Sequence, residues 1–333
     1  MRILLFRDDE RVFAKSGVGR AMKHQEIALK LAGVDFTTDS DADFDIIHLN
    51  TINPQSYLLA KKARRDGKKV VFHAHSTEED FKNSFAFSNV MAPAFKKWLR
   101  QCYNTADILL TPTPYSKSLL DKYKLKAPIV PISNGIELEK FAPDEQKMRA
   151  FREHFGLSED EKVVISVGHY FERKGLPDFC KVAKHFPEVK FIWFGHTAAG
   201  LLTEKVKKAI KNKPDNVILP GYIAGEIIQG AFTSADLFFF PSYEETEGIV
   251  VLESLAAKCQ VLVRNIGVYD GWLEDGENCF MAETNPQFIE KIRGFLAGEI
   301  PSTIEKGYET AQERSLKKVG EQLAKIYTDL AKK

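Results

Sequence analysis

The sequence predicts an α/β protein made of two Rossmann-like domains, each with a parallel sheet and helices between its strands. Short apolar runs alternate with amphipathic stretches, which is the pattern of parallel strands joined by crossover helices. The runs are apolar almost throughout, as expected for strands that are buried on both faces. A chain of 333 residues is long enough for two such domains, and a turn-rich stretch at 133–145 separates them.

The predicted strands form two series of five. The first series is RILLF (2–6), DIIHL (45–49), KVVFHAH (69–75), DILLT (107–111) and PIVPI (128–132). The second series is KVVISVG (162–168), VKFIWFG (189–195), NVILP (216–220), DLFFFP (236–241) and QVLV (260–263). We expect domains at 1–140 and 141–310, and a helix at 311–333 that packs back on the first domain. Ligands of such sheets bind beyond the carboxyl ends of the strands, so we expect the site in a cleft between the domains.

The composition indicates a cytoplasmic protein. A hydrophobic fraction of 44% and a charged fraction of 28% are ordinary for a soluble globular chain. No stretch approaches the roughly 18 apolar residues of a spanning helix. The first apolar run also reaches charged residues too soon for a signal peptide. The four cysteines are scattered and form no CxxC motif.

Basic residues are concentrated in the first domain. Residues 1–140 carry 22 Lys and Arg against 17 Asp and Glu, whereas the remainder carries 25 against 29. Six of the nine residues at 61–69 are basic, which fits either a solvated helix end or attraction to an anionic membrane surface. The stretch 81–103 mixes aromatic and basic side chains, and fits either a core-facing helix or an interfacial one that inserts Trp98. Nucleic acid is not an expected partner, because no such motif is present and the net charge is +1.

A short glycine motif, SGVGR (16–20), follows the first predicted strand and precedes a helical pattern. Gly17 and Gly19 would let backbone N–H groups approach a phosphate at the helix start, although a tight turn explains them equally well. A dinucleotide fingerprint would need glycine at position 22, which is Met22. A nicotinamide dehydrogenase is therefore disfavoured.

Two histidines lie at the end of the strand predicted at 69–75. His73 and His75 fall on the same side of a strand, where either could bond a substrate hydroxyl. A metal pair is the weaker alternative, because no third ligand has a recognisable spacing. One of the two is expected to be a core histidine.

Two basic residues, Arg173 and Lys174, lie between the first strand of the second domain and a helix. Cations oppose the helix dipole in this position, so a bound diphosphate would explain them.

Two glutamates flank the start of an apolar helix in EETEGIVVLESLA (244–256). Glu245 lies on the preceding loop and could accept from two sugar hydroxyls. The amides near Gly248 and Ile249 would face a leaving phosphate. Glu253 lies more than a turn into the helix, where a carboxylate is costly to bury without hydrogen bonds. The hydroxyls of a ribose would satisfy it, and a cap or bridge within the protein is the alternative.

The stretch PSYEETEGIVVLESLA (241–256) resembles the E-x7-E signature of family 4 of retaining glycosyltransferases, which have the two-domain GT-B fold. SGVGR, RKG (173–175) and the linker SNGIELEKF (133–141) extend the resemblance over nearly the whole chain. It implies that Glu245 holds the donor sugar and Glu253 the nucleotide ribose. It also implies that Lys174, with a nearby basic residue, contacts the diphosphate.

The same resemblance implies an acceptor-binding first domain and a donor-binding second domain. His75 best matches the catalytic histidine of family members that act on lipids, and the backbone near Tyr222 and Ile223 is the expected reader of a uridine base. The chain departs from the family at His169, where arginine is frequent, so Arg173 is expected to take over that role. A second departure is Glu247, where phenylalanine is frequent.

The resemblance implies front-face attack in which the leaving phosphate takes the acceptor proton. Arg173, Lys174 and helix amides would stabilise the departing diphosphate, so no metal and no further cofactor is expected. The overlapping Asp-x-Asp pairs of DSDADFD (39–45) favour a metal instead. They precede an apolar strand, however, so they belong to its amino end, away from the expected ligand edge.

The acceptor implied is a membrane glycolipid. The chain length, the SGVGR motif and HAHSTEED (73–80) are similar to bacterial diglycosyl-diacylglycerol synthases. These enzymes imply transfer of glucose or galactose from a UDP-sugar to monoglycosyl-diacylglycerol, by a protein attached to the inner face of the cell membrane. The alternatives are the same chemistry on a soluble or polysaccharide acceptor, a nucleotide-sugar epimerase, and a non-catalytic nucleotide-sugar-binding protein.

Overall fold

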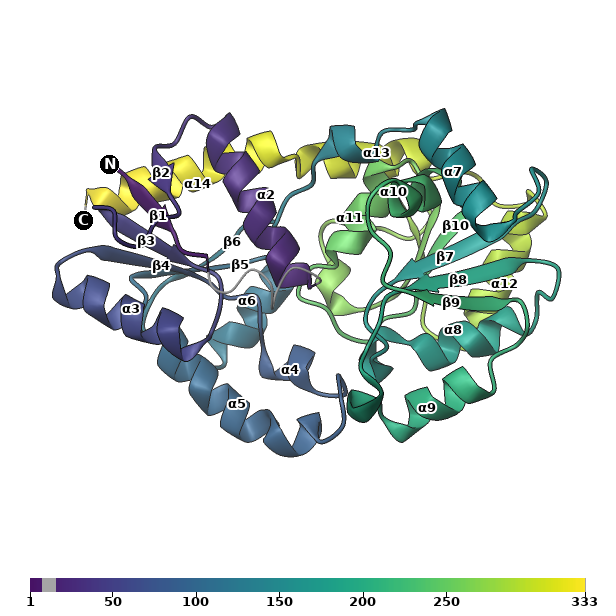
Figure 1. Cartoon of the computed structure of the whole chain (residues 1–333), viewed down its shortest axis with the longest axis horizontal. Helices are drawn as coiled ribbons and strands as arrows, with labels where there is room; N and C mark the ends of the chain where they lie inside the picture. Colours follow the sequence, from purple (N-terminus) through teal and green to yellow (C-terminus); the bar gives the residue numbers. More distant parts are fainter. Residues whose placement is uncertain (8–15, 333) are drawn as a thin grey trace. The chain divides into compact units, whose positions relative to one another are not determined.

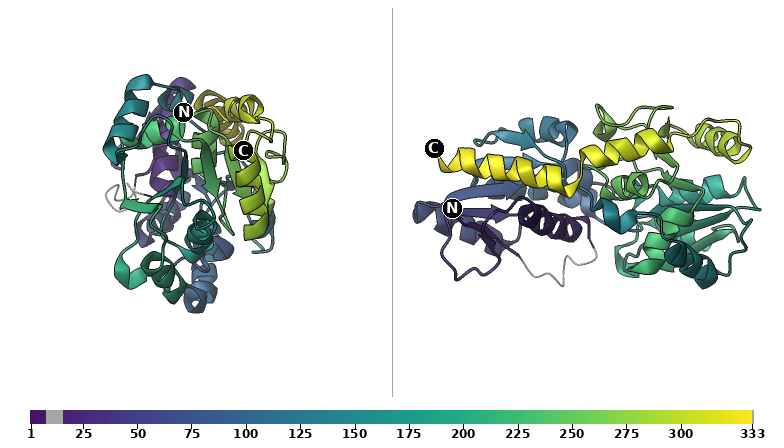
Figure 2. Two further views of the ribbon diagram at one scale, coloured as in Figure 1. Left: turned by 90° about the vertical axis from the view of Figure 1, so that its right-hand side faces the viewer. Right: turned by 90° about the horizontal axis from the view of Figure 1, so that it is seen from above.

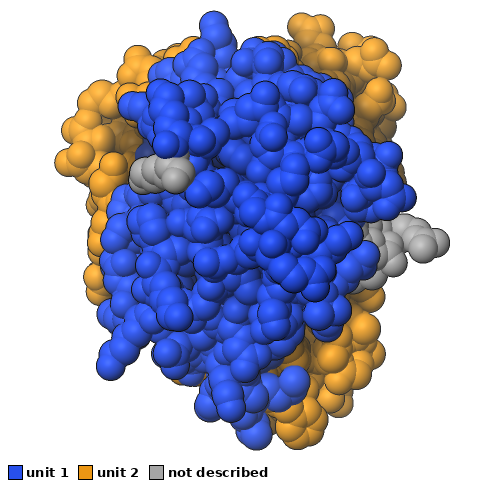
Figure 3. All heavy atoms as spheres, turned by 90° about the vertical axis from the view of Figure 1, so that its left-hand side faces the viewer, with its two compact units in different colours: residues 1–81, 90–136, 314–333 blue, residues 82–89, 137–313 orange. Residues whose placement is uncertain are grey.

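The computed structural model describes residues 1–7 and 16–332, which divide into two compact units. Unit 1 comprises residues 1–81, 90–136 and 314–333, and unit 2 comprises residues 82–89 and 137–313 (Figure 3). Each unit contains a six-stranded parallel sheet with helices on its faces (Figure 1). The predicted α/β class with two parallel sheets is therefore confirmed.

The sheet of unit 1 has the strand order β2-β1-β3-β4-β5-β6, and every pairing is parallel. Its strands are β1 (Ile3–Leu5), β2 (Phe36–Thr37), β3 (Ile46–Leu49), β4 (Lys69–His73), β5 (Ile108–Thr111) and β6 (Ile129–Pro131). The strand order reverses between β1 and β3, so the loops that follow these two strands diverge at the carboxyl edge.

Helices cover both faces of this sheet because alternate strand residues point to opposite sides. The helices are α2 (Gly17–Leu31), α3 (Pro54–Arg65), α4 (Glu78–Phe81), α5 (Ser88–Tyr103), α6 (Pro114–Asp121) and α14 (Leu316–Ala331). On one face, α3, α5 and α6 pack against residues such as Ile47 and Phe72. On the other face, α2 and α14 pack against residues such as Ile46 and Val71.

The last helix, α14, packs on α2 within unit 1, as the sequence predicts for the C-terminal helix (Figure 2). Its apolar residues Leu316, Val319, Leu323 and Tyr327 are buried in the same core as Ala28 of α2. The two backbones approach closely, because a Cβ atom at Gly320 would lie 2.1 Å from the carbonyl oxygen of Ala28.

The sheet of unit 2 has the order β12-β11-β10-β7-β8-β9 and is also parallel. Its strands are β7 (Val163–Val167), β8 (Lys190–Phe194), β9 (Val217–Gly221), β10 (Leu237–Phe240), β11 (Val261–Arg264) and β12 (Phe280–Ala282). The helices are α7 (Glu145–Phe155), α8 (Leu176–Ala183), α9 (Glu204–Lys211), α10 (Glu226–Ser234), α11 (Ile249–Ala256), α12 (Asn285–Leu296) and α13 (Ile304–Glu313). This strand order is that of the doubly wound dinucleotide-binding fold, with its switch point between β7 and β10.

All ten predicted strands are present, each within two residues of its predicted bounds. The edge strands β2 and β12, with two and three residues, were not predicted. Two residues are too few for a strand pattern to be recognised in β2. No helix among the described residues is long and apolar enough to cross a membrane.

Only some side chains of the stretch 81–103 are exposed. Trp98 donates from its indole Nε1 to the carbonyl of Ile52 at 2.7 Å and packs against the core of unit 1. These contacts favour the core-facing interpretation for the half-buried Trp98, and insertion of its ring into a membrane stays a prediction. The exposed apolar side chains are instead Phe87 (79%), Val90 (80%) and Met91 (52%), at the start of α5.

Candidate active site

Two loops of unit 2 follow neighbouring strands at the carboxyl edge of the sheet. β7 and β10 are paired, with Val164 beside Leu237 and Ile165 beside Phe238. The chain leaves β7 into residues 168–175 and leaves β10 into residues 241–248. Ligands of open α/β sheets bind at such a switch point, so the two loops form the candidate donor site.

Gly175 lets these loops approach each other closely. Its φ of 81° is in the left-handed region, and a Cβ atom there would lie 2.3 Å from the carbonyl oxygen of Pro241. Any other residue would therefore push the loops apart. The loops are also joined by a backbone hydrogen bond of 2.7 Å from the N–H of Tyr243 to the carbonyl of Arg173.

Glu245 lies at the centre of the polar groups in this site. Its side chain is 5% exposed, and its Oε1 accepts hydrogen bonds from Lys174 Nζ and, at 2.7 Å, from Ser242 Oγ. Arg173 Nη1 lies 3.9 Å from the same oxygen. Burial alone would raise the pKa of Glu245, but the charges of Lys174 and Arg173 and the hydrogen bonds outweigh it and lower the pKa. The carboxylate of Glu245 is therefore ionised at neutral pH.

Arg173 braces the loops as well as adding charge. Its guanidinium donates from Nε to Ser84 Oγ at 2.7 Å and from Nη1 to the carbonyl of Glu244 at 2.9 Å. Its backbone N–H donates to the carbonyl of Asn83 at 3.0 Å. The short segment 82–89 is thus fixed to the site loop inside unit 2.

The helix α11 begins directly beside this cluster. Gly248 is its N-cap with a φ of 86°, and no side chain caps the helix there. The N–H groups of a first turn give a helix N-terminus its affinity for anions, and those of α11 begin at Ile249. Glu253 lies within α11 and is only 2% exposed.

The other residues predicted to bind the donor lie outside the cluster around Glu245. Tyr222 and Ile223 follow β9, and Tyr222 is 41% exposed. His169 donates from Nδ1 to the carbonyl of His196 at 2.8 Å, and its pKa is lowered by burial and by the charges of Lys174 and Arg173. A neutral histidine therefore occupies the position where the family often has arginine.

Gly17 and Gly19 begin α2 in unit 1. Ser16 caps this helix, since its Oγ accepts from the N–H of Gly19 at 3.1 Å. The amide of Gly19 is therefore already bonded within the chain, and a donor contact from these glycines stays a prediction.

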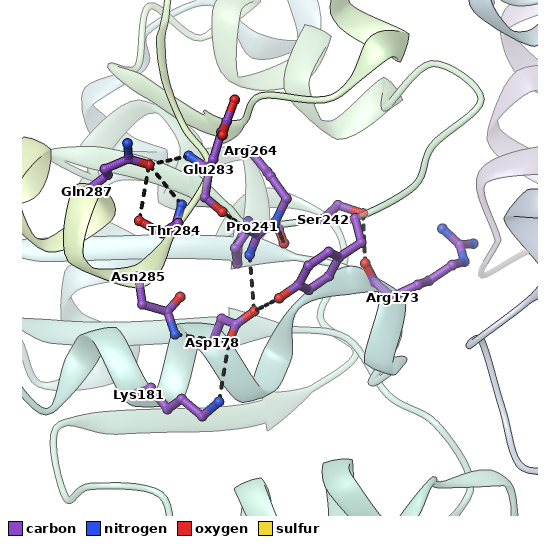
Figure 4. Close-up of polar contacts among 11 residues, drawn as sticks. Arg173, Asp178, Lys181, Pro241, Ser242, Arg264, Glu283, Thr284, Asn285 and Gln287 are labelled. Atoms are coloured by element: carbon purple, nitrogen blue, oxygen red, sulfur yellow. Dashed lines mark hydrogen bonds and ion pairs between the residues drawn. The ribbon is translucent and has the colours of Figure 1, made fainter.

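A network around the buried Asp178 and Arg264, behind the site loop, was not predicted from the sequence. Asp178 on α8 accepts from Tyr243 Oη at 2.6 Å, from Arg264 Nη2 at 3.1 Å and from Asn285 Nδ2 at 3.1 Å (Figure 4). Arg264 also donates from Nε to the carbonyl of Pro241 at 3.1 Å. These bonds hold the loop that carries Glu245. Only the charged Arg264 at the end of an apolar strand could have suggested them.

Unit 1, described by itself, contains a stack of three buried histidines. The rings of His73 and His75 are 4.2 Å apart between centroids and nearly parallel, and His48 of β3 stacks on His73 at 5.8 Å. The two rings are brought together as expected, but β4 ends at His73, and His75 follows it in a turn in which its N–H donates to the carbonyl of His73 at 3.1 Å. His48 was missed, because it lies within the apolar run of its strand.

An amide pair connects the two predicted histidines. Gln25 of α2 and Asn50 exchange two hydrogen bonds of 2.9 and 2.8 Å. Gln25 Nε2 lies 2.7 Å from His73 Nδ1, and His75 Nε2 lies 2.9 Å from Asn50 Oδ1. Because Asn50 Oδ1 can only accept, His75 carries its proton on Nε2, and Nδ1 keeps a lone pair.

All three histidines are held neutral. Burial lowers the pKa of His48 and of His75 to about 3. It lowers the pKa of His73 well below its usual value, with a further contribution from the charges of His75 and His48. His73 is a hydrogen-bonded core histidine, and His75, at 8% exposure, is the more accessible of the predicted pair.

The predicted Asp-x-Asp segment lies at the amino end of β3. Asp45 directly precedes the strand, and Asp43 forms an ion pair of 2.9 Å with Lys68. Residues 1–7 and 16–332 contain no group of three or more acidic, histidine or cysteine side chains arranged to hold a metal ion.

Comparison with known proteins identifies the family. Residues 31–140 match Glycosyltransferase Family 4, and residues 147–314 match Glycosyl transferases group 1. The chain is 44% identical to the processive diacylglycerol alpha-glucosyltransferase of Acholeplasma laidlawii, over 100% of this chain and 99% of that protein. The chain belongs to glycosyltransferase family 4. The transferase is also 26% identical to the alpha-galactosylglucosyldiacylglycerol synthase of Streptococcus pneumoniae, over 100% of this chain and 90% of that protein.

Solved structures with the same fold cover the whole transferase. Anabaena HepE in complex with UDP-glucose has a TM-score of 0.78 at 15% identity, over 99% of this chain and 100% of that one. Sucrose-phosphate synthase of Thermosynechococcus elongatus has a TM-score of 0.80 at 17% identity, over 99% of each chain. At these identities the likeness shows the fold alone, and it confirms the predicted GT-B fold.

Proposed function

We propose that the protein transfers a hexose from a UDP-sugar to diacylglycerol and to its monoglycosyl derivative, with retention of configuration. The observation that carries this is the 44% identity, over the full chain, to a processive diacylglycerol alpha-glucosyltransferase. That relative favours glucose over galactose as the sugar. Its processive action favours both diacylglycerol and monoglucosyl-diacylglycerol as acceptors, which widens the acceptor expected from the sequence.

The cluster in unit 2 supports a leaving-group role for its cations. During transfer, a bond forms between the acceptor oxygen and the anomeric carbon, and the bond from that carbon to the UDP oxygen breaks. The acceptor proton passes to a phosphate oxygen of the departing UDP. Lys174 and the N-terminus of α11 provide positive charge where negative charge develops, and Glu245 holds the sugar hydroxyls.

The groups of unit 1 fit a hydroxyl-binding role. His75 is neutral, and its Nδ1 lone pair is set by the hydrogen bond from Nε2 to Asn50. A neutral imidazole acceptor suits a hydroxyl group of a sugar or of a glycerol.

A matrix of donors and acceptors tests this function. UDP-glucose, UDP-galactose and GDP-mannose would each be incubated with diacylglycerol, monoglucosyl-diacylglycerol, free glucose and a soluble glucan. We expect lipid products from UDP-glucose with both lipid acceptors, and product chains of more than one sugar from diacylglycerol. Efficient transfer to the glucan alone would contradict the proposal. UDP-sugar interconversion without transfer would support an epimerase.

We further propose that transfer needs no metal ion, since basic side chains and helix amides provide the charge stabilisation. The expected result is that excess EDTA leaves most of the activity of the UDP-glucose reaction. Loss of activity that manganese restores would instead support a metal bound by the Asp-x-Asp segment at 39–45.

We propose that the protein acts at the inner face of the cell membrane by inserting residues 87–91. Phe87, Val90 and Met91 are at least half exposed, and Phe87 has a φ of 69°, a conformation that side chains rarely adopt. Exposed basic residues at the end of α3 would add attraction to anionic lipid. Attraction of this kind fades beyond about 8 Å at physiological salt.

Vesicle sedimentation distinguishes the two contributions. Replacing Phe87, Val90 and Met91 by serine is expected to reduce binding at low and at high salt. Replacing Lys61, Lys62 and Arg65 should reduce it at low salt only. Arg64 is spared because it donates to the carbonyl of Thr105 at 3.3 Å.

Leu31→Ser is the matched control, since Leu31 is 59% exposed at the end of α2, outside the proposed contact, and its replacement should leave vesicle binding unchanged. A wild-type protein that does not bind anionic vesicles at low salt would contradict the membrane proposal. The transferase assignment would remain.

A further inference from the structure

The hydroxyl of Tyr269 is a buried polar group at the edge of the candidate donor site. Tyr269 ends a short 3₁₀ turn after β11 and is 1% exposed. Within the part of the chain that the structure describes, its Oη has no hydrogen-bond partner. Buried polar groups in proteins are nearly always bonded, and leaving one without a partner is unfavourable. A ligand atom that accepts from this hydroxyl would remove that penalty.

The hydroxyl lies beside the start of α11. A Cβ atom at Gly248, the N-cap, would lie 3.5 Å from Tyr269 Oη and 3.8 Å from its Cε1. No side chain caps the helix, and its first N–H groups, from Ile249 onward, directly follow Gly248. Burial raises the pKa of Tyr269 well above its usual value, and the charge of Glu245 raises it further. The hydroxyl therefore stays protonated at neutral pH and acts as a donor.

The groups around this point favour an anion as the occupant. A helix N-terminus attracts negative charge, and Lys174 and Arg173 add two cations near Glu245. If Glu245 holds the transferred sugar, the group next to that sugar is the phosphate to which it is attached. A phosphate oxygen there would be reached by the helix amides, the lysine and the phenol together.

We propose that Tyr269 donates a hydrogen bond to the β-phosphate of a bound nucleoside diphosphate sugar. This assignment rests on the proposed use of a UDP-sugar, and adds a donor-binding residue that no sequence motif indicates. The hydroxyl would add an uncharged donor beside the helix amides and the charged Lys174. It would also remain bonded to the UDP that is released after transfer.

Tyr269→Phe removes only this hydroxyl, so its effects on stability and on binding can be separated. The melting temperature of the ligand-free protein is expected to stay the same or rise, because an unbonded buried group is lost. The Kd for UDP, measured by titration calorimetry, is expected to rise about ten- to a hundredfold, as for loss of a hydrogen bond to a charged group. The Kd for UMP, which lacks the β-phosphate, should change much less.

Tyr103→Phe is the matched control. Tyr103 is fully buried in unit 1, and its Oη donates to the carbonyl of Ser76 at 2.8 Å. Removing that bonded hydroxyl should lower the melting temperature and leave the affinity for UDP unchanged.

Three results would overturn the proposal. A Tyr269→Phe protein that binds UDP as tightly as wild type would show that the hydroxyl does not contact the donor. Equal losses of affinity for UDP and UMP would exclude the β-phosphate as its partner. A wild-type protein that does not bind UDP would overturn this proposal together with the proposed function, whereas the first two results leave that function intact.

Discussion

Replacing Lys174 with alanine is expected to lower the turnover number at least tenfold, and toward the hundredfold typical of losing one preorganised donor. Lys174 Nζ is hydrogen-bonded to the buried carboxylate of Glu245, so the substitution removes a cation from the proposed leaving group and from Glu245 together. Glu245→Gln should have a similar effect, because the neutral amide binds sugar hydroxyls less strongly. Steady-state transfer of labelled glucose, with turnover and KM resolved separately, measures both.

Two variants distinguish catalysis from general damage. Lys162→Ala is the matched lysine control, because Lys162 forms an ion pair of 2.8 Å with Asp236 at the opposite, amino end of β7. Its turnover should stay close to wild type. Glu253→Gln should mainly raise KM for the donor, since contacts to a ribose change little during bond cleavage. Wild-type turnover in the Lys174→Ala and Glu245→Gln proteins would contradict the proposed roles of these residues in leaving-group stabilisation and sugar binding.

Acidification from pH 7.5 to pH 5 is expected to destabilise the protein by several kcal/mol. His48, His73 and His75 are neutral in the folded state, with pKa values lowered by burial to about 3 for His48 and His75. In the unfolded chain each would titrate near its ordinary value of about 6.5. The unfolded state therefore binds protons that the folded state does not, and stability falls as the pH drops below about 6.5. At pH 5 His48 and His75 each contribute roughly 2 kcal/mol of this loss, and His73 adds to it in the same direction.

Urea unfolding at a series of pH values measures this effect. The free energy of unfolding should fall with a slope that approaches three protons below pH 6. The double variant His48→Leu/Tyr327→Phe replaces both partners of a buried 2.5 Å hydrogen bond by apolar side chains. Its slope should be smaller by about one proton. His185→Ala, at an exposed histidine, is the matched control. An unchanged slope in the double variant would show that His48 is not the proton-linked group.

The strands could be predicted because they are buried on both faces, so an apolar run marks each of them. Phe238 and Phe239, for example, are both fully buried although they point to opposite sides of the sheet. Such runs do not show which strands pair with each other. That β7 lies beside β10 is seen only in the folded sheet. The catalytic candidates on the loops after these strands were nevertheless identifiable. Arg173 and Lys174 precede a helix, where cations oppose the dipole, and Glu253 falls within an apolar helix.

The supporting residues could not be predicted in the same way. Asp178 is one acidic residue near the start of a helix, a common place for one, and only the fold brings it to Arg264, 86 positions later. Gln25 and Asn50 likewise meet through the packing of α2 on the sheet. The indole of Trp98 has a backbone partner in Ile52, a contact that amphipathic patterning does not reveal. Hydrogen bonds between residues distant in the sequence depend on the tertiary structure, which local sequence patterns do not predict.

The passage of the chain between the units has a consequence for biosynthesis. Unit 1 includes residues 314–333, so its α14 leaves the ribosome after all of unit 2 has been made. Until then the nascent first unit exposes the apolar side of α2 and of its strands, and His48 lacks Tyr327. The emerging polypeptide would therefore need protection from self-association until residues 314–333 have been made, and a premature stop near residue 313 would leave a chain with a complete second unit and an open first one.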